Sequence, residues 1–277
     1  MKSAFQKDDT LLADIARTRQ SGETKLWWLG QSGFLFLSPA GSVLFDPYLS
    51  DTLTVKYAST DKPHTRVTEQ VIDPARLIGI DVITNSHNHT DHLDAETLLP
   101  LLKVNPNAKL VSPRANREFI LGRLGDVADR LVEIDAGESV TVAGVEFHGI
   151  AAAHNTVERD DSGYCKFLGF VARLGGITLY HSGDTLWHDG LVEALKPYAP
   201  DVAMVPINGN LPERRVSGNL NGREAAALAR EIGAGLAVPH HYDLFKFNTA
   251  SPSEFETECA RLSQPFHTLQ NGEGLQL

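Results

Sequence analysis

Residues 85–94, NSHNHTDHLD, place three histidines and two aspartates in ten consecutive positions. Imidazole and carboxylate groups are common ligands of first-row divalent metals, and four candidates within six positions argue against a polar surface loop with chance histidines. In an extended backbone His87 and His89 would point to one side, whereas the adjacent Asp91 and His92 would diverge. This spacing predicts two neighbouring metal ions, the first held by His87 and His89 and the second by Asp91 and His92. The pair of histidines four apart on a helix, which a zincin requires, is absent here.

Apolar runs precede this cluster and three further groups of metal-binding residue types. The stretch IGIDVITNS leads into the cluster, VEFHGIAAAH ends at His154, ITLYHSGD ends at Asp184, and GLAVPHHYD contains His240 and His241. Short apolar runs bounded by turn residues predict strands. Side chains that follow several strands can meet at one edge of the sheets, where a rigid scaffold positions loops. We therefore expect these four segments to converge on one site.

The remaining sequence alternates strand-like and helix-like patterns without a linker or a low-complexity tract. Strands are expected at Lys25–Leu29, Gly33–Leu37, Ser42–Phe45, Gly79–Thr84, Lys109–Ser112, Ser139–Val142, Val145–Ala151, Phe167–Leu174, Ile177–Tyr180, Val202–Pro206 and Leu236–Pro239. Helices are expected at Ala95–Leu102, Ala115–Leu124, Leu191–Leu195, Gly222–Glu231 and Ser253–Leu262, after an amphipathic N-terminal helix that ends near Gly22. This order predicts an α/β protein with one domain over residues 1–277 and two sheets between helices.

Composition restricts the classes of function. The chain has 277 residues, a formal net charge of −10 and no run of lysine or arginine, so binding to a nucleic-acid backbone is not expected. No stretch has the ~18 consecutive apolar residues that a membrane span needs, and the N-terminus lacks the apolar core of a signal peptide. Two cysteines give no disulfide framework, so a cytoplasmic location is expected. Bound divalent cations can reverse the local charge, so the acidic chain can still take an anionic small molecule.

The ligand pattern resembles that of the metallo-β-lactamase superfamily, whose signature is H-x-H-x-D-H followed by a distant His, a Gly-Asp and a final His. The resemblance spans essentially the whole chain and implies an αββα sandwich of two mixed sheets. The matching residues are His87, His89, Asp91, His92, His154, Asp184 and His241. The segments KLWWLGQSGF, LFDP, SHNHTDHLD, LYHSGDT and VPHHYDLF are more closely similar to the L-ascorbate-6-phosphate lactonase branch. His154 stands where that lactonase has an aspartate, as in the general superfamily pattern.

The resemblance also implies roles for single residues. Asp184 would bridge two metal ions, His241 rather than His240 would be the final ligand, and Asp46 would support the metal site. A carboxylate at position 89 would indicate the iron redox branch of the superfamily, so His89 favours hydrolysis. A further set of residues is expected to support the site or contact the substrate, and its members are Asp46, His181, His240, Asn208, Arg214 and Arg215. For His181 a structural role is equally compatible with the sequence.

These expectations define a metal-dependent hydrolase with two divalent ions, manganese or zinc, with iron as a further option. A metal-bound hydroxide would attack the substrate, and Asp91 and Asp184 would be the catalytic carboxylates. A lactone of a phosphorylated sugar acid is the first expectation for the substrate, a phosphodiester the second and a β-lactam the third. A non-catalytic protein that binds metal or a metabolite is the alternative from another class. For Arg214 and Arg215 a clamp on a phosphate or carboxylate and a solvated loop are equally compatible with the sequence, and the lactonase relatives suggest a homo-oligomer.

Overall fold

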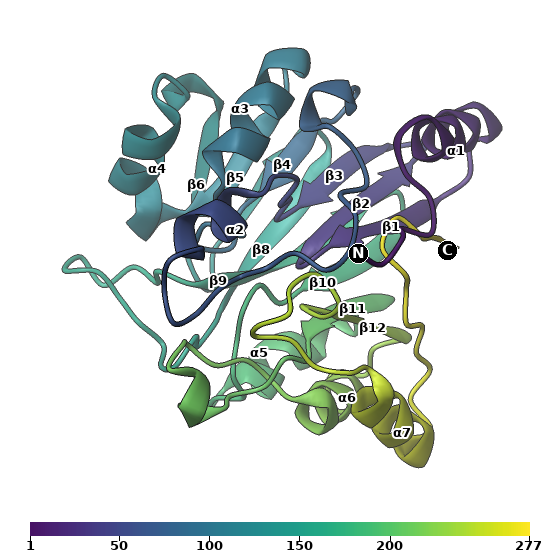
Figure 1. Ribbon diagram of the computed structural model, residues 1–277. Helices are drawn as coiled ribbons and strands as arrows, with labels where there is room; N and C mark the ends of the chain where they lie inside the picture. Colours follow the sequence, from purple (N-terminus) through teal and green to yellow (C-terminus); the bar gives the residue numbers. More distant parts are fainter.

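The computed structural model describes residues 1–277 and consists of two β-sheets packed face to face (Figure 1). The first sheet contains β1 (Lys25–Gly30), β2 (Gly33–Ser38), β3 (Gly41–Phe45), β4 (Val82–Thr84), β5 (Lys109–Pro113), β6 (Leu131–Ile134) and β13 (Gly274–Gln276). Its strand order is β13-β1-β2-β3-β4-β5-β6. The strands from β3 to β6 are parallel, whereas β13, β1, β2 and β3 pair antiparallel.

The second sheet is built from the later part of the chain. It contains β7 (Ser139–Val142), β8 (Val145–Ala151), β9 (Leu168–Leu174), β10 (Ile177–His181), β11 (Val202–Pro206) and β12 (Leu236–His240), in the order β12-β11-β10-β9-β8-β7. The strands from β10 to β12 are parallel and the others antiparallel. Both sheets are therefore mixed, as the superfamily resemblance implied.

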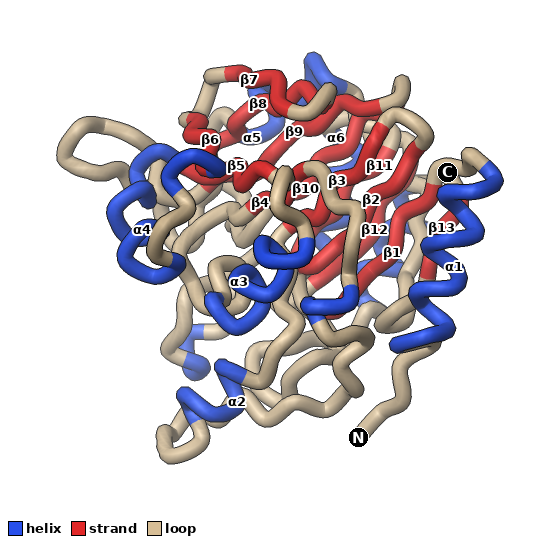
Figure 2. The backbone as a smooth tube through the Cα atoms, turned by 90° about the horizontal axis from the view of Figure 1, so that it is seen from above, coloured by secondary structure: helices blue, strands red, loops and turns tan.

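Helices cover the outer face of each sheet (Figures 1 and 2). On the side of the first sheet lie α1 (Asp8–Ser21), α3 (Ala95–Val104) and α4 (Arg117–Leu124), and on that of the second lie α5 (Leu191–Leu195), α6 (Gly222–Glu231) and α7 (Ser253–Leu262). The short helix α2 (Thr52–Tyr57) lies away from the sheets (Figure 2), and its Leu53 packs with Tyr48, Leu244 and Phe245. Short 3-10 helices occupy Pro74–Arg76, Arg114–Asn116, Ala128–Arg130, Lys196–Tyr198 and Pro212–Arg214. The αββα sandwich is confirmed. No helix is long and apolar enough to cross a membrane.

The residues of β2 show why the protein has two hydrophobic cores, one on each face of the first sheet. Successive side chains of a strand point to opposite faces, and both faces of this strand are apolar. Phe34 and Phe36 enter the core between the two sheets, whereas Leu35 and Leu37 enter the core beneath α1, α3 and α4. All six residues of β2 are buried, so the strand appears in the sequence as a continuous apolar run rather than an alternating one.

The eleven strands expected from the sequence are all present, with small shifts at their ends. The largest shift concerns the run expected at 79–84, in which only Val82–Thr84 is a strand. Gly79 has a φ of 75°, and the Ile80 N–H donates to the Asn105 side chain (3.0 Å) instead of to a neighbouring strand. The edge strands β6 and β13 and the short helix α2 were not predicted, because their apolar patterns are short.

Candidate metal centre

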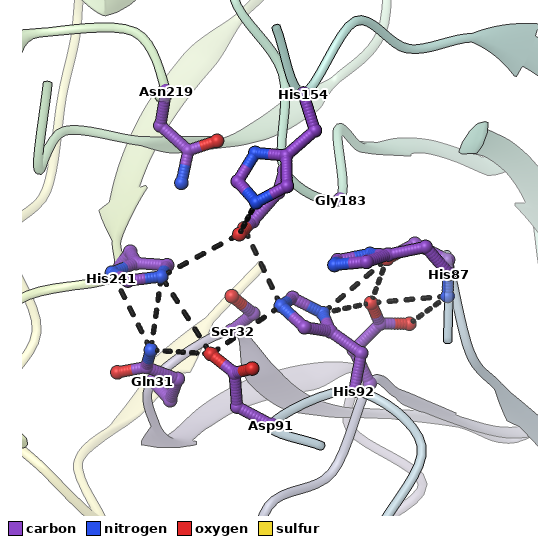
Figure 3. A network of polar contacts seen from close by, with 12 residues as sticks. Gln31, Ser32, His87, Asp91, His92, His154, Gly183, Asn219 and His241 are labelled. Atoms are coloured by element: carbon purple, nitrogen blue, oxygen red, sulfur yellow. Dashed lines mark hydrogen bonds and ion pairs between the residues drawn. The ribbon is translucent and has the colours of Figure 1, made fainter. Parts of the chain in front are cut away.

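The predicted ligands come together where four strands end. The loop 85–94 follows β4, His154 follows β8, Asp184 follows β10 and His241 follows β12. The side chains of Asp91, His92, His154 and His241 face one another (Figure 3). The first of these strands belongs to one sheet and the other three belong to the second sheet. The site therefore lies between the two sheets, at the edge formed by the carboxyl ends of their strands.

The loop 85–94 reaches this arrangement by a different backbone path from the one expected. It is a series of bends and turns rather than an extended segment, and the N–H groups of His92 and Leu93 both donate to the His89 carbonyl (3.1 and 2.8 Å). The turn brings His92 back toward His87, and their ring centroids lie 4.0 Å apart. Asp91 Oδ2 also lies 3.7 Å from His92 Nε2, so these adjacent side chains converge on one point and the divergence expected from an extended backbone is wrong.

Asp184 occupies the middle of the cluster. One carboxylate oxygen lies 3.5 Å from His92 Nε2, and the other lies 3.5 Å from His154 Nε2 and 3.6 Å from His241 Nε2. Its two oxygens thus face different groups of nitrogen atoms. This is the placement that a carboxylate needs in order to bridge two cations.

The donor atoms fit divalent metal ions in two respects. Ligands at about 2.1 Å from a tetrahedral ion lie roughly 3.4 Å from one another, close to the 3.5–3.8 Å separations of His92, His241, Asp91 and Asp184. His87 Nε2, His92 Nε2 and Asp184 Oδ1 are buried and have no hydrogen-bond partner. Buried polar atoms without a partner are rare and call for an explanation such as an ion. Ligand atoms of His87, His89 and His154 also lie within 4.8 Å of one another.

Neighbouring groups fix the orientation of the histidine rings. His92 Nδ1 lies 2.7 Å from Asp46 Oδ2, and His154 Nδ1 lies 2.8 Å from the Gly218 carbonyl. In both rings Nε2 is therefore the nitrogen that faces the centre of the cluster. Asp46 itself is held by Ser86, which donates from its backbone N–H (3.0 Å) and from its hydroxyl. Asp46 therefore has the supporting position that the superfamily resemblance implied.

The electrostatics of the cluster favour a bound positive charge. Burial alone would lower the pKa of His92, but the carboxylates of Asp184 and Asp91 outweigh it and raise this pKa well above its usual value. Burial, together with repulsion from neighbouring histidines, lowers the pKa of His87 well below its usual value and that of His89 to about 4. His87 and His89 are thus neutral, as metal ligands must be, whereas His92 carries a proton that a cation bound between it and the two carboxylates would replace.

Gln31 is a member of the site that the sequence reasoning missed. Its side-chain amide nitrogen lies 2.9 Å from Asp91 Oδ2 and 3.0 Å from His241 Nε2 (Figure 3). Gln31, Asp46 and His241 all have positive φ angles, of 51°, 38° and 64°. Non-glycine residues held in this region store strain, and such residues cluster at functional sites. Gln31 lies within a segment that resembles the lactonase branch, but its spacing from the histidines gave no reason to select it.

The cluster forms the floor of a cavity of about 450 Å³, a size typical of small-molecule sites. Asp91, His89, His154, Asp184 and His241 line it, and only four of the seventeen lining residues are hydrophobic. A cavity lined largely by polar groups suits a polar substrate better than an apolar one.

The other residues expected near the substrate lie elsewhere. His181 and His240 are fully buried, and their rings stack on one another at 5.2 Å, outside the cavity wall. Asn208 exchanges hydrogen bonds with Asn248 and Asn219. Arg214 donates to the backbone carbonyls of Asn208 (2.6 Å) and Thr249 (2.9 Å), while Arg215 forms an exposed ion pair with Asp61. The structure therefore places neither arginine in the cavity, and the lining cations are instead Lys56, Lys62 and Arg123.

Comparison with known proteins defines the class to which this fold and site belong. Residues 42–242 match the model of the beta-lactamase superfamily domain. Igni18, a metallo hydrolase from Ignicoccus hospitalis, is similar in structure, with a TM-score of 0.65, 22% sequence identity, and coverage of 92% of this chain and 98% of that one. The chain is a member of the metallo-β-lactamase superfamily.

Two relatives narrow the class further. A UPF0173 metal-dependent hydrolase from Methanoculleus marisnigri is 31% identical over 242 residues, which cover 86% of this chain and 89% of the relative. A probable L-ascorbate-6-phosphate lactonase, UlaG, from Escherichia fergusonii is 22% identical over 262 residues, covering 84% of this chain and 73% of the relative. The chain belongs to the UPF0173 metal-dependent hydrolases and is an enzyme of that kind.

Proposed function

We propose that the protein hydrolyses the lactone of a small acidic sugar derivative, with two divalent metal ions held by the seven predicted ligands. The observation that carries this proposal is the position of Asp91 and Asp184 between the histidines on the floor of a polar cavity. One ion would be held by His87, His89, His154 and Asp184, and the other by Asp91, His92, Asp184 and His241. The similarity to a probable lactonase supports this class of substrate.

Divalent cations bound there would supply Lewis acidity, which activates water and polarises a carbonyl or phosphoryl oxygen. The chain itself supplies the groups that orient the reactants and move protons. The side chain of Asp91 is 15% exposed and lines the cavity, whereas that of Asp184 is 3% exposed. Asp91 is therefore the carboxylate that can touch both the attacking water and the substrate.

The contact with Gln31 gives the two carboxylate oxygens of Asp91 different roles. The Gln31 amide donates to Oδ2, so Oδ1 is the oxygen available to accept a proton from the attacking water. As the water oxygen attacks the lactone carbonyl carbon, the ring C–O bond breaks and the leaving alkoxide takes the proton from Asp91. The product is the open hydroxy acid, and the carboxylate is restored for the next cycle.

Metal analysis followed by a substrate panel tests the proposal. The panel contains an acidic sugar lactone, a phosphodiester of similar size and a β-lactam, each with the metal-loaded full chain. We expect turnover of the lactone above the other two, and a loss of at least about a hundredfold in Asp91→Asn, within the range for a group that transfers a proton. Asp161→Asn changes an exposed carboxylate outside the cavity and serves as the matched control.

Three results would count against the proposal. Preferred turnover of the phosphodiester would assign the site to the second expected substrate class. Full activity of Asp91→Asn would remove Asp91 from the mechanism. A protein that binds metal but turns over no member of the panel would favour the non-catalytic alternative.

A further inference from the structure

The charged residues around the cavity are distributed unevenly. Its only carboxylates are those of Asp91 and Asp184, which belong to the candidate metal centre, and its remaining charged side chains are the three cations Lys56, Lys62 and Arg123. None of the three forms an ion pair with a carboxylate, although acidic residues outnumber basic ones by 35 to 25 in the whole chain. Three cations that face one cavity and belong to no ion pair give their side of it a positive potential, which is suited to binding an anion.

We infer that these three cations bind an acidic group of the substrate, a carboxylate or a phosphate that lies away from the bond to be hydrolysed. This inference rests on the proposed function, because the metal centre at the cavity floor would hold the reacting group. The cations would then decide which small esters or lactones are accepted, and Lys56 and Lys62 would be specificity-determining residues. The two arginines of the loop after β11 are excluded from this role by their contacts.

Lys56 lies next to the loop 85–94, although 34 residues separate it from Thr90 in the sequence. Its ammonium group donates to Thr90 Oγ1 at 3.2 Å, and Thr90 immediately precedes Asp91. Adjacent Cα atoms are ~3.8 Å apart, so the ammonium group lies close to the floor of the cavity. An ammonium group has three donors, and the contact with Thr90 uses one of them. The other donors remain available to a ligand.

Lys62 and Arg123 extend the same cationic wall. The Lys62 ammonium donates to the backbone carbonyl of Arg215, a neutral acceptor, and the neighbouring carboxylate of Asp61 is paired with the Arg215 guanidinium. The Arg123 guanidinium donates to the carbonyls of Asn88 (3.1 Å) and Leu93 (2.8 Å), both in the loop 85–94. Because a guanidinium has five N–H donors, Arg123 can hold this loop and still face an anion. It therefore has a structural role as well, and the lysines are the better residues to substitute.

Calorimetric titration of the metal-loaded full chain tests the inference without requiring turnover. The probes are glucose 6-phosphate, gluconate and glucose, which carry a phosphate, a carboxylate and no charge. We expect Lys56→Ala and Lys62→Ala each to weaken binding of the preferred acidic probe about tenfold, the effect of losing one hydrogen bond to a charged group. Lys56→Arg should retain most of the affinity. Lys103→Ala removes an exposed lysine on α3, outside the cavity, and should change nothing.

If the lysine variants lose affinity for glucose 6-phosphate, the cations bind a phosphate. If they lose affinity for gluconate, the cations bind a carboxylate. The inference is overturned if the wild-type chain binds neither acid at millimolar concentration, if both lysine variants bind as the wild type does, or if Lys103→Ala weakens binding equally. Lysine-dependent binding without hydrolysis of any lactone would refute the proposed function and leave the anion site standing. Equal hydrolysis of an acidic and a neutral lactone by the wild type and by Lys56→Ala would refute the anion site alone.

Discussion

Gly183 is the position at which a single added carbon atom should disturb the candidate metal centre. It joins the end of β10 to Asp184 with a φ of 57°. A Cβ atom there would lie 2.6 Å from the Ser86 Cβ and 2.8 Å from the Leu168 carbonyl oxygen, distances that real Cβ atoms do not reach. Gly183→Ala would therefore combine about 1 kcal/mol for an alanine in the left-handed region with about 1–3 kcal/mol for the overlap. We expect the free energy of unfolding to fall by ~2–4 kcal/mol.

Urea denaturation with and without bound metal measures this effect. Gly176→Ala is the matched control, because Gly176 also has a positive φ (82°) but a Cβ there would meet nothing within 4 Å. Ser86 holds Asp46, which orients His92, so displacement of Ser86 should also lower the amount of metal retained. If Gly183→Ala were no less stable than Gly176→Ala and bound metal normally, the steric part of the reasoning would be refuted.

Two further predictions concern Asp14 on α1 and Gln31 beside Asp91. Burial raises the pKa of Asp14, but hydrogen bonds from Lys25, Gln6 and Trp27 outweigh this and hold the pKa well below its usual value. Asp14→Asn should therefore lower the free energy of unfolding by ~1–3 kcal/mol at pH 7. Because the pKa of Asp14 is depressed in the folded state, the difference in stability between the wild type and this variant should shrink below about pH 4. Urea denaturation of both proteins at pH 7 and at pH 3 measures this. Gln31→Met removes the amide that contacts Asp91 while keeping a side chain of similar length. We expect slower turnover and, by elemental analysis, weaker retention of one metal ion. Unchanged metal content together with an unchanged rate would contradict this role of Gln31.

The sequence was sufficient to predict the sandwich and the convergence of the candidate ligands, for a physical reason. Buried strands need continuous apolar runs, and those runs are visible without knowledge of the tertiary structure. The ligands follow the runs directly, as His154 follows β8 and Asp184 follows β10. A residue whose position is determined by the end of a recognisable strand can therefore be placed from the sequence.

The cavity wall could not be predicted in this way. The polar segment after β11 contains two arginines, for which the sequence was equally compatible with contact to an anion and with a solvated loop. The carbonyl groups that Arg214 binds belong to Asn208 and to Thr249, which lies 35 residues further along the chain. Lys56, by contrast, lies on α2, a short helix without a clear apolar pattern, and reaches the cavity because α2 lies beside the loop 85–94. Which cation faces the substrate is thus decided by contacts between distant loops.

The candidate metal ligands and the cations of the cavity wall together would allow an acidic chain to accept an acidic substrate. Two divalent cations would exceed the charge of Asp91 and Asp184 by two units, and the three cations of the cavity wall add to that excess. The net charge of −10 is therefore carried outside the site and does not describe the field inside it. Substituting ligands of the metal centre should abolish turnover of every substrate, whereas substituting Lys56 or Lys62 should change only the preference among substrates. Chemistry and specificity would then be separable by mutation, because the first depends on residues at strand ends and the second on the residues of α2 and the loop that follows it.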